Sequence, residues 1–419
     1  MIDIKLLRKD PEFFQKAVRD KQLTLDVAHI LEIDAKQQQL AKNVQTIREE
    51  RNLLTSGIHG KPTVEQIVKG KELRERLEKE EHALAAVEGE LREWLLKIPN
   101  PPASDVPIGK DESDNVEIRK WGNIPEFSFT PKPHEELALG VDGVDFKRAV
   151  KMAGTRAYIF KGDMVLLEQA ILRFALDYKI EKGFMPMTVP WMVNKEALWG
   201  TGYFPWGIED HYTTQDGQGL IGTAEVGLTA YYQDEILEEK DLPIKMVGIS
   251  PCFRREVGSY GKDTKGFIRV HQFNKVEQVV LSIADEEETR KWHEKMLGYS
   301  EEILQQLGLA YRVLLMCTGD MGAGQRKKYD IETWFPSLNT YRETHSASYF
   351  NDFQSRRLNM RYKAKDGSIQ YVYTLNNTVA ATPRLLAAVI ENYQQEDGSI
   401  KIPEVLQKYM GSKSIIPVK

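Results

Sequence analysis

The sequence predicts an α+β protein: an antiparallel sheet flanked by helices, preceded by an arm of two antiparallel α-helices that form a coiled coil. Two runs near the N-terminus repeat an apolar residue every seven positions, and the later sequence alternates short β-rich runs with helical runs but lacks regular βαβ spacing. At 419 residues the chain is too long for a single ordinary core. We expect an N-terminal domain over 1–105, a linker over 106–125 and a second domain over 126–419.

The arm is predicted from two heptad repeats, which mark the a/d seam of a coiled coil. Gly57, Gly60 and Pro62 interrupt the pattern between the two runs, so the helices should meet at a short turn and lie antiparallel. We expect a projecting hairpin over about 28–98, each helix of which extends roughly 45 Å. The heptad positions are Ile33, Leu40, Ile47 and Leu54 in the first run and Leu77, Leu84, Leu91 and Ile98 in the second.

Positive charge concentrates in the distal half of the arm. Residues 36–79 hold ten Lys and Arg against six Asp and Glu, whereas 27–35 and 80–98 together carry a net charge of -5. Because the whole chain also carries -5, contact with nucleic acid would be local rather than a coating by bulk charge. The alternative is a set of ordinary solvated faces with i,i+4 ion pairs. The candidates for phosphate contacts include Lys36, Arg48, Arg51, Lys69, Arg74 and Arg76.

The second domain is predicted from short β-rich runs and longer helical patterns. Neither the P-loop pattern nor the dinucleotide-binding glycine pattern occurs, so a nucleotide would have to be held in another way, for which arginines are suited. The β-rich runs cover 246–249, 267–270, 275–281, 311–316, 329–335 and 369–375, and the helices lie near 164–182, 223–238, 284–307 and 379–393.

One block combines arginines, glycines and β-rich segments. Pro251-Cys252-Phe253-Arg254-Arg255-Glu256 is followed by Gly258-Ser259-Tyr260-Gly261 and then by a run from Gly266 to Glu277. A strand, a loop and a returning strand would bring Arg254 and Arg269 close together. Since guanidinium groups bind phosphate oxygens in pairs of hydrogen bonds, this block predicts a phosphate site.

The two cysteines, Cys252 and Cys317, lack C-x-x-C spacing, which excludes a disulfide framework and a thiolate zinc site. The N-terminus has no apolar signal segment, and no stretch of about 18 apolar residues occurs. We expect a cytoplasmic protein that is neither secreted nor membrane-spanning.

The arginine block resembles motif 2 of the class II aminoacyl-tRNA synthetases, and together with the arm it is similar to the seryl-tRNA synthetase family. The resemblance extends from Met1 to about Met410. Other segments agree: Gly183 to Pro190 is similar to motif 1, Asn376-Asn377-Thr378 and Thr382-Pro383-Arg384 resemble motif 3, Thr223-Ala224-Glu225 resembles the amino-acid signature, and Tyr341-Arg342-Glu343 resembles the ATP-side segment. Many bacterial members carry Asn-Gly-Ser at 376–378, Ser-Ser at 345–346 and Gly at 383.

The resemblance implies a class II synthetase-like fold and an activity. Serine would be activated with ATP and Mg²⁺ to seryl-adenylate and pyrophosphate, then passed to the 3′ end of tRNA(Ser); use of tRNA(Sec) is left open. The serine carboxylate is itself the nucleophile, so the site would act by positioning and charge neutralisation. The arm would bind the tRNA, and motif 1 would form much of a homodimer interface.

The resemblance also implies roles for individual residues, each of which alone would be as compatible with a salt bridge, a cap or a core position. His271 and His345 have no partner at metal spacing, and we expect structural roles for their rings. The catalytic residues would be Arg254, Arg269 and Arg384. ATP would be bound by Arg254, Arg255, Glu256, Phe273, Glu343, Thr344, His345, Ser346 and Arg384, and Mg²⁺ by Glu343 and Ser346. Serine would be bound by Thr223, Ala224, Glu225, Arg254, Glu277, Asn376 and Thr378.

Two other kinds of protein are alternatives. An enzyme of the same fold could activate a small amino acid for a carrier other than tRNA, but it would have no obvious use for a hairpin of about 45 Å. A noncatalytic coiled-coil interaction protein would not explain why Arg254, Glu277 and Arg384 are all present.

Overall fold

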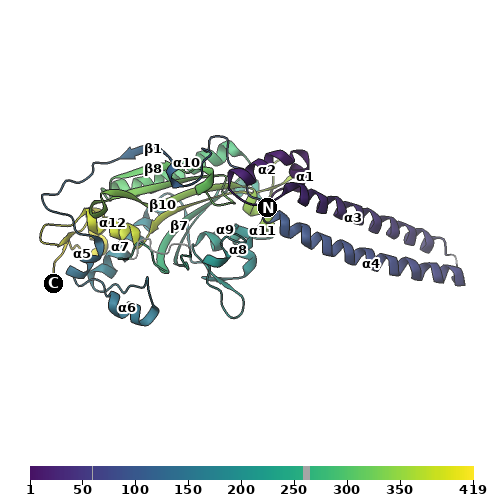
Figure 1. The fold of residues 1–419 in the computed structure, drawn as a ribbon, viewed down its shortest axis with the longest axis horizontal. Helices are drawn as coiled ribbons and strands as arrows, with labels where there is room; N and C mark the ends of the chain where they lie inside the picture. The colour runs from purple at the N-terminus through teal and green to yellow at the C-terminus, as the bar shows by residue number, and fades with distance from the viewer. Residues whose placement is uncertain (59, 258–264) are drawn as a thin grey trace. The chain divides into compact units, whose positions relative to one another are not determined.

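A computed structural model describes residues 1–58, 60–257 and 265–419 (Figure 1). The chain divides into two compact units, Met1–Pro101 and Pro102–Lys419. The glycine-rich segment Gly258-Ser259-Tyr260-Gly261, for which the sequence predicts a loop, lies outside the described residues.

The first unit is dominated by two long helices that lie side by side, α3 (Val27–Ser56) and α4 (Val64–Leu95), as Figure 1 shows. Thr63 and Gln66 form a capping box at the start of α4, which satisfies backbone donors that the helix leaves free. Ile47 and Leu73 are buried between the helices, so the predicted coiled-coil hairpin is confirmed. Two short helices precede it, α1 (Ile4–Lys9) and α2 (Pro11–Asp20).

The second unit is built on an eight-stranded sheet in which all neighbouring strands are antiparallel except β2 and β6. This architecture confirms the predicted α+β class. In spatial order the strands are β1 (Val116–Trp121), β8 (Tyr311–Leu315), β9 (Lys327–Phe335), β10 (Thr340–Asn351), β13 (Tyr373–Ala381), β7 (Gln272–Ser282), β6 (Ile244–Phe253) and β2 (Met185–Met187).

Helices pack on both faces of this sheet, and alternate residues of β7 join the hydrophobic cores on the two faces. Val276 and Val280 join the core formed with α7 (Asp163–Glu181), α10 (Glu286–Gln306) and α12 (Arg384–Asn392). Val279 and Leu281 instead join the core formed with α8 (Lys195–Thr201), α9 (Glu225–Ala230) and α11 (Phe353–Leu358). Because successive strand residues point to opposite faces, Glu277 lies on the α9 side.

The remaining elements are short. They are α5 (His134–Gly140), α6 (Phe146–Ala153), α13 (Glu404–Gln407), β3 (Met192–Val193), β4 (Gly219–Leu220), β5 (Ile236–Glu238), β11 (Arg361–Lys363), β12 (Ile369–Tyr371), β14 (Ile400–Lys401) and β15 (Ile415–Ile416), with six 3₁₀ turns among the described residues.

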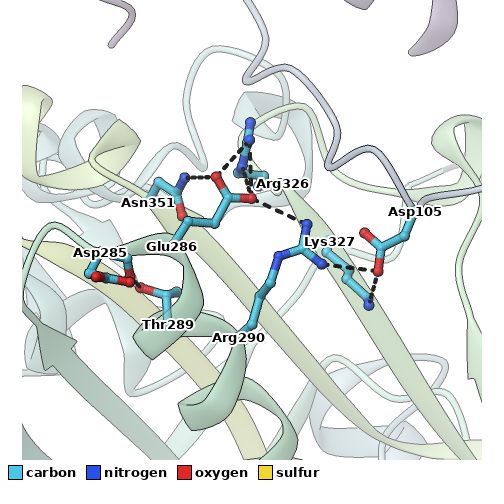
Figure 2. A network of polar contacts seen from close by, with 8 residues as sticks. All are labelled: Asp105, Asp285, Glu286, Thr289, Arg290, Arg326, Lys327 and Asn351. Atoms are coloured by element: carbon cyan, nitrogen blue, oxygen red, sulfur yellow. Dashed lines mark hydrogen bonds and ion pairs between the residues drawn. The ribbon is translucent and has the colours of Figure 1, made fainter.

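The segment 106–125, for which the sequence predicts a linker, contains β1. This strand pairs with β8, so the segment belongs to the sheet of the second unit. Just before it, Asp105 accepts hydrogen bonds from Lys327 at 2.6 Å and Arg290 at 3.1 Å, in the ionic network of Figure 2. The polar composition of 106–125 conceals the strand because all six residues of β1 are exposed.

Three predicted elements are wrong: one strand is absent and two helices are shorter than expected. The run 267–270 forms a turn and bends instead of a strand, and the Phe267 ring packs against the His134 and Phe160 rings. The helix predicted over 223–238 shrinks to α9 and is followed by β5. Only 384–392 of the helix predicted over 379–393 is helical, since β13 continues to Ala381 and Pro383 caps α12.

Among the residues that the structure describes, no helix combines the length and the apolar character that crossing a bilayer requires.

Candidate active site

Two adjoining cavities lie on the large sheet, the first where β7, β10, β13 and the start of α12 converge and the second beside β8, β9 and β10. The first, of about 60 Å³, is lined by residues that include Arg254, Phe273 and Thr378. The second, of about 540 Å³, is lined by Arg269 among others. Both are bordered by Glu343 and Arg384, so the predicted arginines and carboxylates converge on one site.

Arg254 follows directly after β6 and is held in place by the returning strand. Its backbone N–H donates to the carbonyl of His271 at 2.9 Å. Its guanidinium lies 5.2 Å from the ring centroid of Phe273, in cation–π geometry. The end of β6 and the start of β7 therefore bring a cation and an aromatic face into one cavity.

Glu256 and Arg269 form an ion pair across the two ends of the segment between β6 and β7. Arg269 Nη1 donates to Glu256 Oε2 at 2.7 Å. Glu256 has a φ of 55°, in the left-handed region. Such backbone strain in a non-glycine residue is found most often at functional sites. Arg269 is therefore held by Glu256, which lines the same cavity as Arg254.

Arg384 begins α12 and connects three parts of the site. Its Nη1 donates to Glu343 Oε2 at 2.9 Å, and its Nε donates to the carbonyl of Ile268 at 3.1 Å. Burial alone would raise the pKa of Glu343, but the positive charges of Arg384 and Lys328 outweigh burial and hold that pKa below its ordinary value. Glu343 is therefore an ionised carboxylate at neutral pH.

A bulge in β10 turns Glu343 and Ser346 toward the same face of the sheet. The two residues are three positions apart, which in a regular strand would place them on opposite faces. Glu343 pairs with Glu332 and Ser346 pairs with Asp330, with one extra residue of β10 between them. The bulge thus aligns a carboxylate and a hydroxyl along the cavity.

Glu277 and Thr378 occupy paired positions of β7 and β13. The Thr378 hydroxyl donates to Glu277 Oε2 at 3.2 Å, and Lys275 Nζ forms a 2.5 Å ion pair with the same oxygen. Glu277 is 2% exposed. A buried carboxylate with these partners is suited to recognising a hydrogen-bonding group on a ligand.

The Thr223-Ala224-Glu225 segment lies beside this pair, although none of its residues lines the two cavities. The Thr223 hydroxyl accepts from the backbone N–H of Glu225 at 3.2 Å. Glu225 accepts from Tyr203 Oη at 2.6 Å and from Gln354 Nε2 at 2.9 Å. Burial, with the negative charge of Glu277 as a further cause, raises the pKa of Glu225.

Four residues predicted to bind ATP or serine either lie outside the two cavities or make hydrogen bonds within the sheet. Arg255 is exposed and donates to the carbonyl of Glu209 at 3.0 Å, outside the cavities. Asn376 is buried in β13 but lines neither cavity. Thr344 and His345 border the first cavity, while the His345 ring contacts the Thr344 hydroxyl and the carbonyl of Val379.

Three charged residues in or near this site are absent from the sequence prediction: Lys275, Lys328 and Asp330. Lys275 lines the first cavity. Lys328 Nζ donates to Asp330 Oδ2 at 2.9 Å, and burial raises the pKa of Asp330. The sequence signal for Lys328 and Asp330 is the alternation of charged residues along β9. This alternation places Lys328, Asp330 and Glu332 on one face of the sheet.

The arginine-lined site on an antiparallel sheet defines a class of protein, the class II aminoacyl-tRNA synthetases. Residues 210–393 match the family model described as the tRNA synthetase class II core domain (G, H, P, S and T). Residues 1–102 match the model described as the seryl-tRNA synthetase N-terminal domain.

Relatives that match over the whole chain show which family of this class the chain belongs to. The serine–tRNA ligase of Deinococcus radiodurans is 43% identical over 421 residues, covering 99% of each chain. The crystal structure of seryl-tRNA synthetase from Pyrococcus horikoshii complexed with ATP matches at 40% identity with a TM-score of 0.93, covering 100% of both chains. The cytoplasmic serine–tRNA ligase of Naegleria fowleri in complex with AMP matches at 31% identity and a TM-score of 0.89, covering 100% of this chain and 99% of that one. This chain belongs to the seryl-tRNA synthetase family, and it is an aminoacyl-tRNA synthetase and a ligase.

Proposed function

We propose that the paired cavities are the place where serine is joined to ATP, and that the helical hairpin binds the tRNA that receives the serine. The observation that carries this proposal is the convergence of Arg254, Arg269 and Arg384 on two adjoining cavities. Support also comes from two related structures, which hold ATP and AMP.

For ATP, Arg254 would contact the α-phosphate and the serine carboxylate, while Phe273 stacks on the adenine and Glu256 accepts from its amino group. Arg269 and Arg384 would bind the outer phosphates and stabilise the departing pyrophosphate. These roles need fixed cations where negative charge is transferred, and the ion pairs with Glu256 and Glu343 hold Arg269 and Arg384 in position.

Magnesium would be held by Glu343 and Ser346. Mg²⁺ prefers oxygen ligands and commonly binds through one or two carboxylates together with substrate phosphates. The ionised Glu343 carboxylate and the aligned Ser346 hydroxyl fit this requirement, and no cluster of three or more His, Cys, Asp and Glu offers another metal site in the described part of the chain. The ion would neutralise phosphate charge.

For serine, Glu277 and Thr378 would bind the side-chain hydroxyl, and Glu225 the ammonium group. The hydroxyl of serine could bond to Glu277 beside Thr378, whereas alanine or glycine would leave that carboxylate with an unmet hydrogen bond. Thr223 would support Glu225 by capping its backbone N–H.

The hairpin would contact tRNA through its distal basic side chains. Lys36, Arg51 and Arg74 have no ion-pair partner among the described residues, and all three are exposed. Arg48 instead bonds Glu81 across the hairpin at 2.7 Å, and Arg76 lies 3.6 Å from Glu50. The unpaired cations are therefore the better candidates for tRNA phosphates, and tRNA(Ser), with tRNA(Sec) as a second candidate, would be the substrate.

A homodimer is supported by the edge of the large sheet. β2 is the terminal strand of that sheet, and an unpaired edge strand offers free backbone groups to a partner. Exposed apolar side chains accompany it, including Met185, Trp191 and Met192. A second copy of this chain would cover them. The two free, buried cysteines suit a reducing cytoplasm.

The proposal is tested by serine-dependent ATP–pyrophosphate exchange with a pair of neighbouring variants. Arg254→Ala should abolish exchange because it removes the cation of the first cavity. Arg255→Ala should leave exchange close to wild type, since its side chain points outward. Equal loss in both variants, or no exchange by the wild-type protein, would contradict the proposal.

A further inference from the structure

His134, at the start of α5, lies outside the residues matched by either family model and makes two directional hydrogen bonds in a buried position. Its Nδ1 lies 2.9 Å from Glu391 Oε1, and its Nε2 accepts from the backbone N–H of Phe267 at 3.3 Å. The ring is 4% exposed. Because a backbone N–H can only donate, Nε2 must be the acceptor, so Nδ1 carries the proton and donates to Glu391.

Glu391 is a fixed anchor for this ring. Its side chain is fully buried, and it also accepts from the backbone N–H of His134 at 3.0 Å and from that of Ser337 at 3.1 Å. Glu391 and Arg384 are on the same helix, α12. The anchor therefore belongs to the element that presents Arg384 to the cavities.

Phe267 is the point where the chain re-enters the core before β7. Its ring is fully buried, with the His134 ring at 4.6 Å and the Phe160 ring at 5.0 Å. The preceding Gly266 has a φ of +71°, and a Cβ there would lie 2.1 Å from His134 Nε2. The backbone at this position approaches the imidazole as closely as glycine allows.

Ile268, the next residue, connects Phe267 to Arg384 in the proposed active site. The carbonyl of Ile268 accepts from Arg384 Nε at 3.1 Å, and Arg384 in turn donates to Glu343. The contacts form a closed circuit: Glu391 holds His134, His134 holds the Phe267 N–H, and the Ile268 carbonyl orients the guanidinium of Arg384. Both ends of the circuit are in α12.

We propose that His134 is a positioning residue for the outer phosphates of ATP, acting through Phe267 and Ile268 on Arg384. It touches neither cavity. Serine recognition by Glu277 and Thr378 does not pass through this circuit. The proposal rests on the proposed function of the cavities, and it predicts a defect that is selective for ATP.

The test compares two amide substitutions, using the KM values for ATP and for serine in pyrophosphate exchange. In His134→Gln the side-chain oxygen can reach the Nε2 position and accept from Phe267. In His134→Asn the amide can donate to Glu391 but is too short for Phe267. His134→Asn should raise the KM for ATP about three- to tenfold, the equivalent of one lost hydrogen bond, with the KM for serine unchanged. His134→Gln should raise the KM for ATP less than His134→Asn does, because it keeps the bond to Phe267 and loses only the anchor to Glu391.

Gly266→Ala gives an independent test that leaves His134 and Glu391 intact. The added methyl group would displace the Phe267 N–H from His134 and should cause the same ATP-selective defect. The inference is overturned if His134→Asn matches His134→Gln, if Gly266→Ala leaves the KM for ATP unchanged, or if both KM values rise together. A wild-type protein without serine-dependent exchange would contradict the proposed function instead.

Discussion

The Thr378 hydroxyl donates to the Glu277 carboxylate at 3.2 Å across the adjoining strands β13 and β7. The same carboxylate is paired with Lys275 at 2.5 Å. This arrangement places a buried acceptor at the proposed serine site, with a hydroxyl donor on one side and a lysine on the other.

Removal of the Thr378 hydroxyl should weaken serine binding selectively. Thr378→Val keeps the shape but leaves Glu277 without this donor, so we expect the KM for serine to rise about three- to tenfold while the KM for ATP stays near wild type. Thr378→Ser is the matched control, because it keeps the hydroxyl. Wild-type use of serine by Thr378→Val would show that this hydroxyl has no role in recognition.

Glu343→Gln should weaken the binding of magnesium. The substitution removes the negative charge but keeps the shape, so the Mg²⁺ concentration for half-maximal exchange should rise at least about tenfold, as expected for a lost metal ligand. The control is Glu332→Gln, since Glu332 pairs with Glu343 across β9 and β10 but is held by Arg312 at 2.6 Å. Identical magnesium titrations for the two variants would argue against Glu343 as a ligand.

The hairpin should matter for tRNA but not for adenylate formation. Arg51→Ala combined with Arg74→Ala removes two exposed cations, so serylation of tRNA should fall and its dependence on salt should become shallower. Pyrophosphate exchange should not change. Arg92→Ala, on the same helix as Arg74 but in the acidic flank, is the control. A loss of exchange equal to the loss of serylation would contradict the separation of roles.

Lys179 should make the free energy of unfolding depend on pH. Burial, with Lys182 and Lys245 nearby, lowers the pKa of Lys179 to about 6 from an ordinary 10.5. The ring faces of Phe184 and Tyr299 lie 3.6 and 3.8 Å from Nζ, and they oppose this shift because they favour the charged form. Between these pKa values the unfolded chain binds a proton that the folded chain does not. The free energy of unfolding therefore rises with pH, by at most about 1.4 kcal/mol per pH unit.

Lys179→Met should remove this contribution. Chemical denaturation at pH 6.5 and pH 9 should show a smaller increase for the variant than for the wild type. Lys182→Met is the control, because Lys182 is partly exposed and bonds Glu302 at 2.9 Å. If both variants show the wild-type increase, Lys179 is not neutral in the folded state.

The hairpin and the general position of the site could be predicted because their signals are local. A heptad repeat indicates directly which residues are buried between two helices, and Ile47 and Leu77 are buried where it places them. The arginine block likewise requires only the pairing of neighbouring strands β6 and β7 to bring Arg254 beside Phe273.

The rest depends on tertiary structure that no local pattern encodes. The bulge that aligns Glu343 with Ser346 arises from pairing with β9. Phe267 is a good strand residue by type, but aromatic side chains distant in the sequence bury it in a turn. His134 and Glu391 are 257 positions apart, so neither residue indicates the other.

The central claim is that this site activates serine, and the most direct measurement is ATP–pyrophosphate exchange across serine, threonine, alanine, glycine and cysteine. The Glu277–Thr378 pair predicts strong exchange with serine and little with alanine or glycine, which lack the hydroxyl. Exchange with another amino acid of this panel and none with serine would contradict the account.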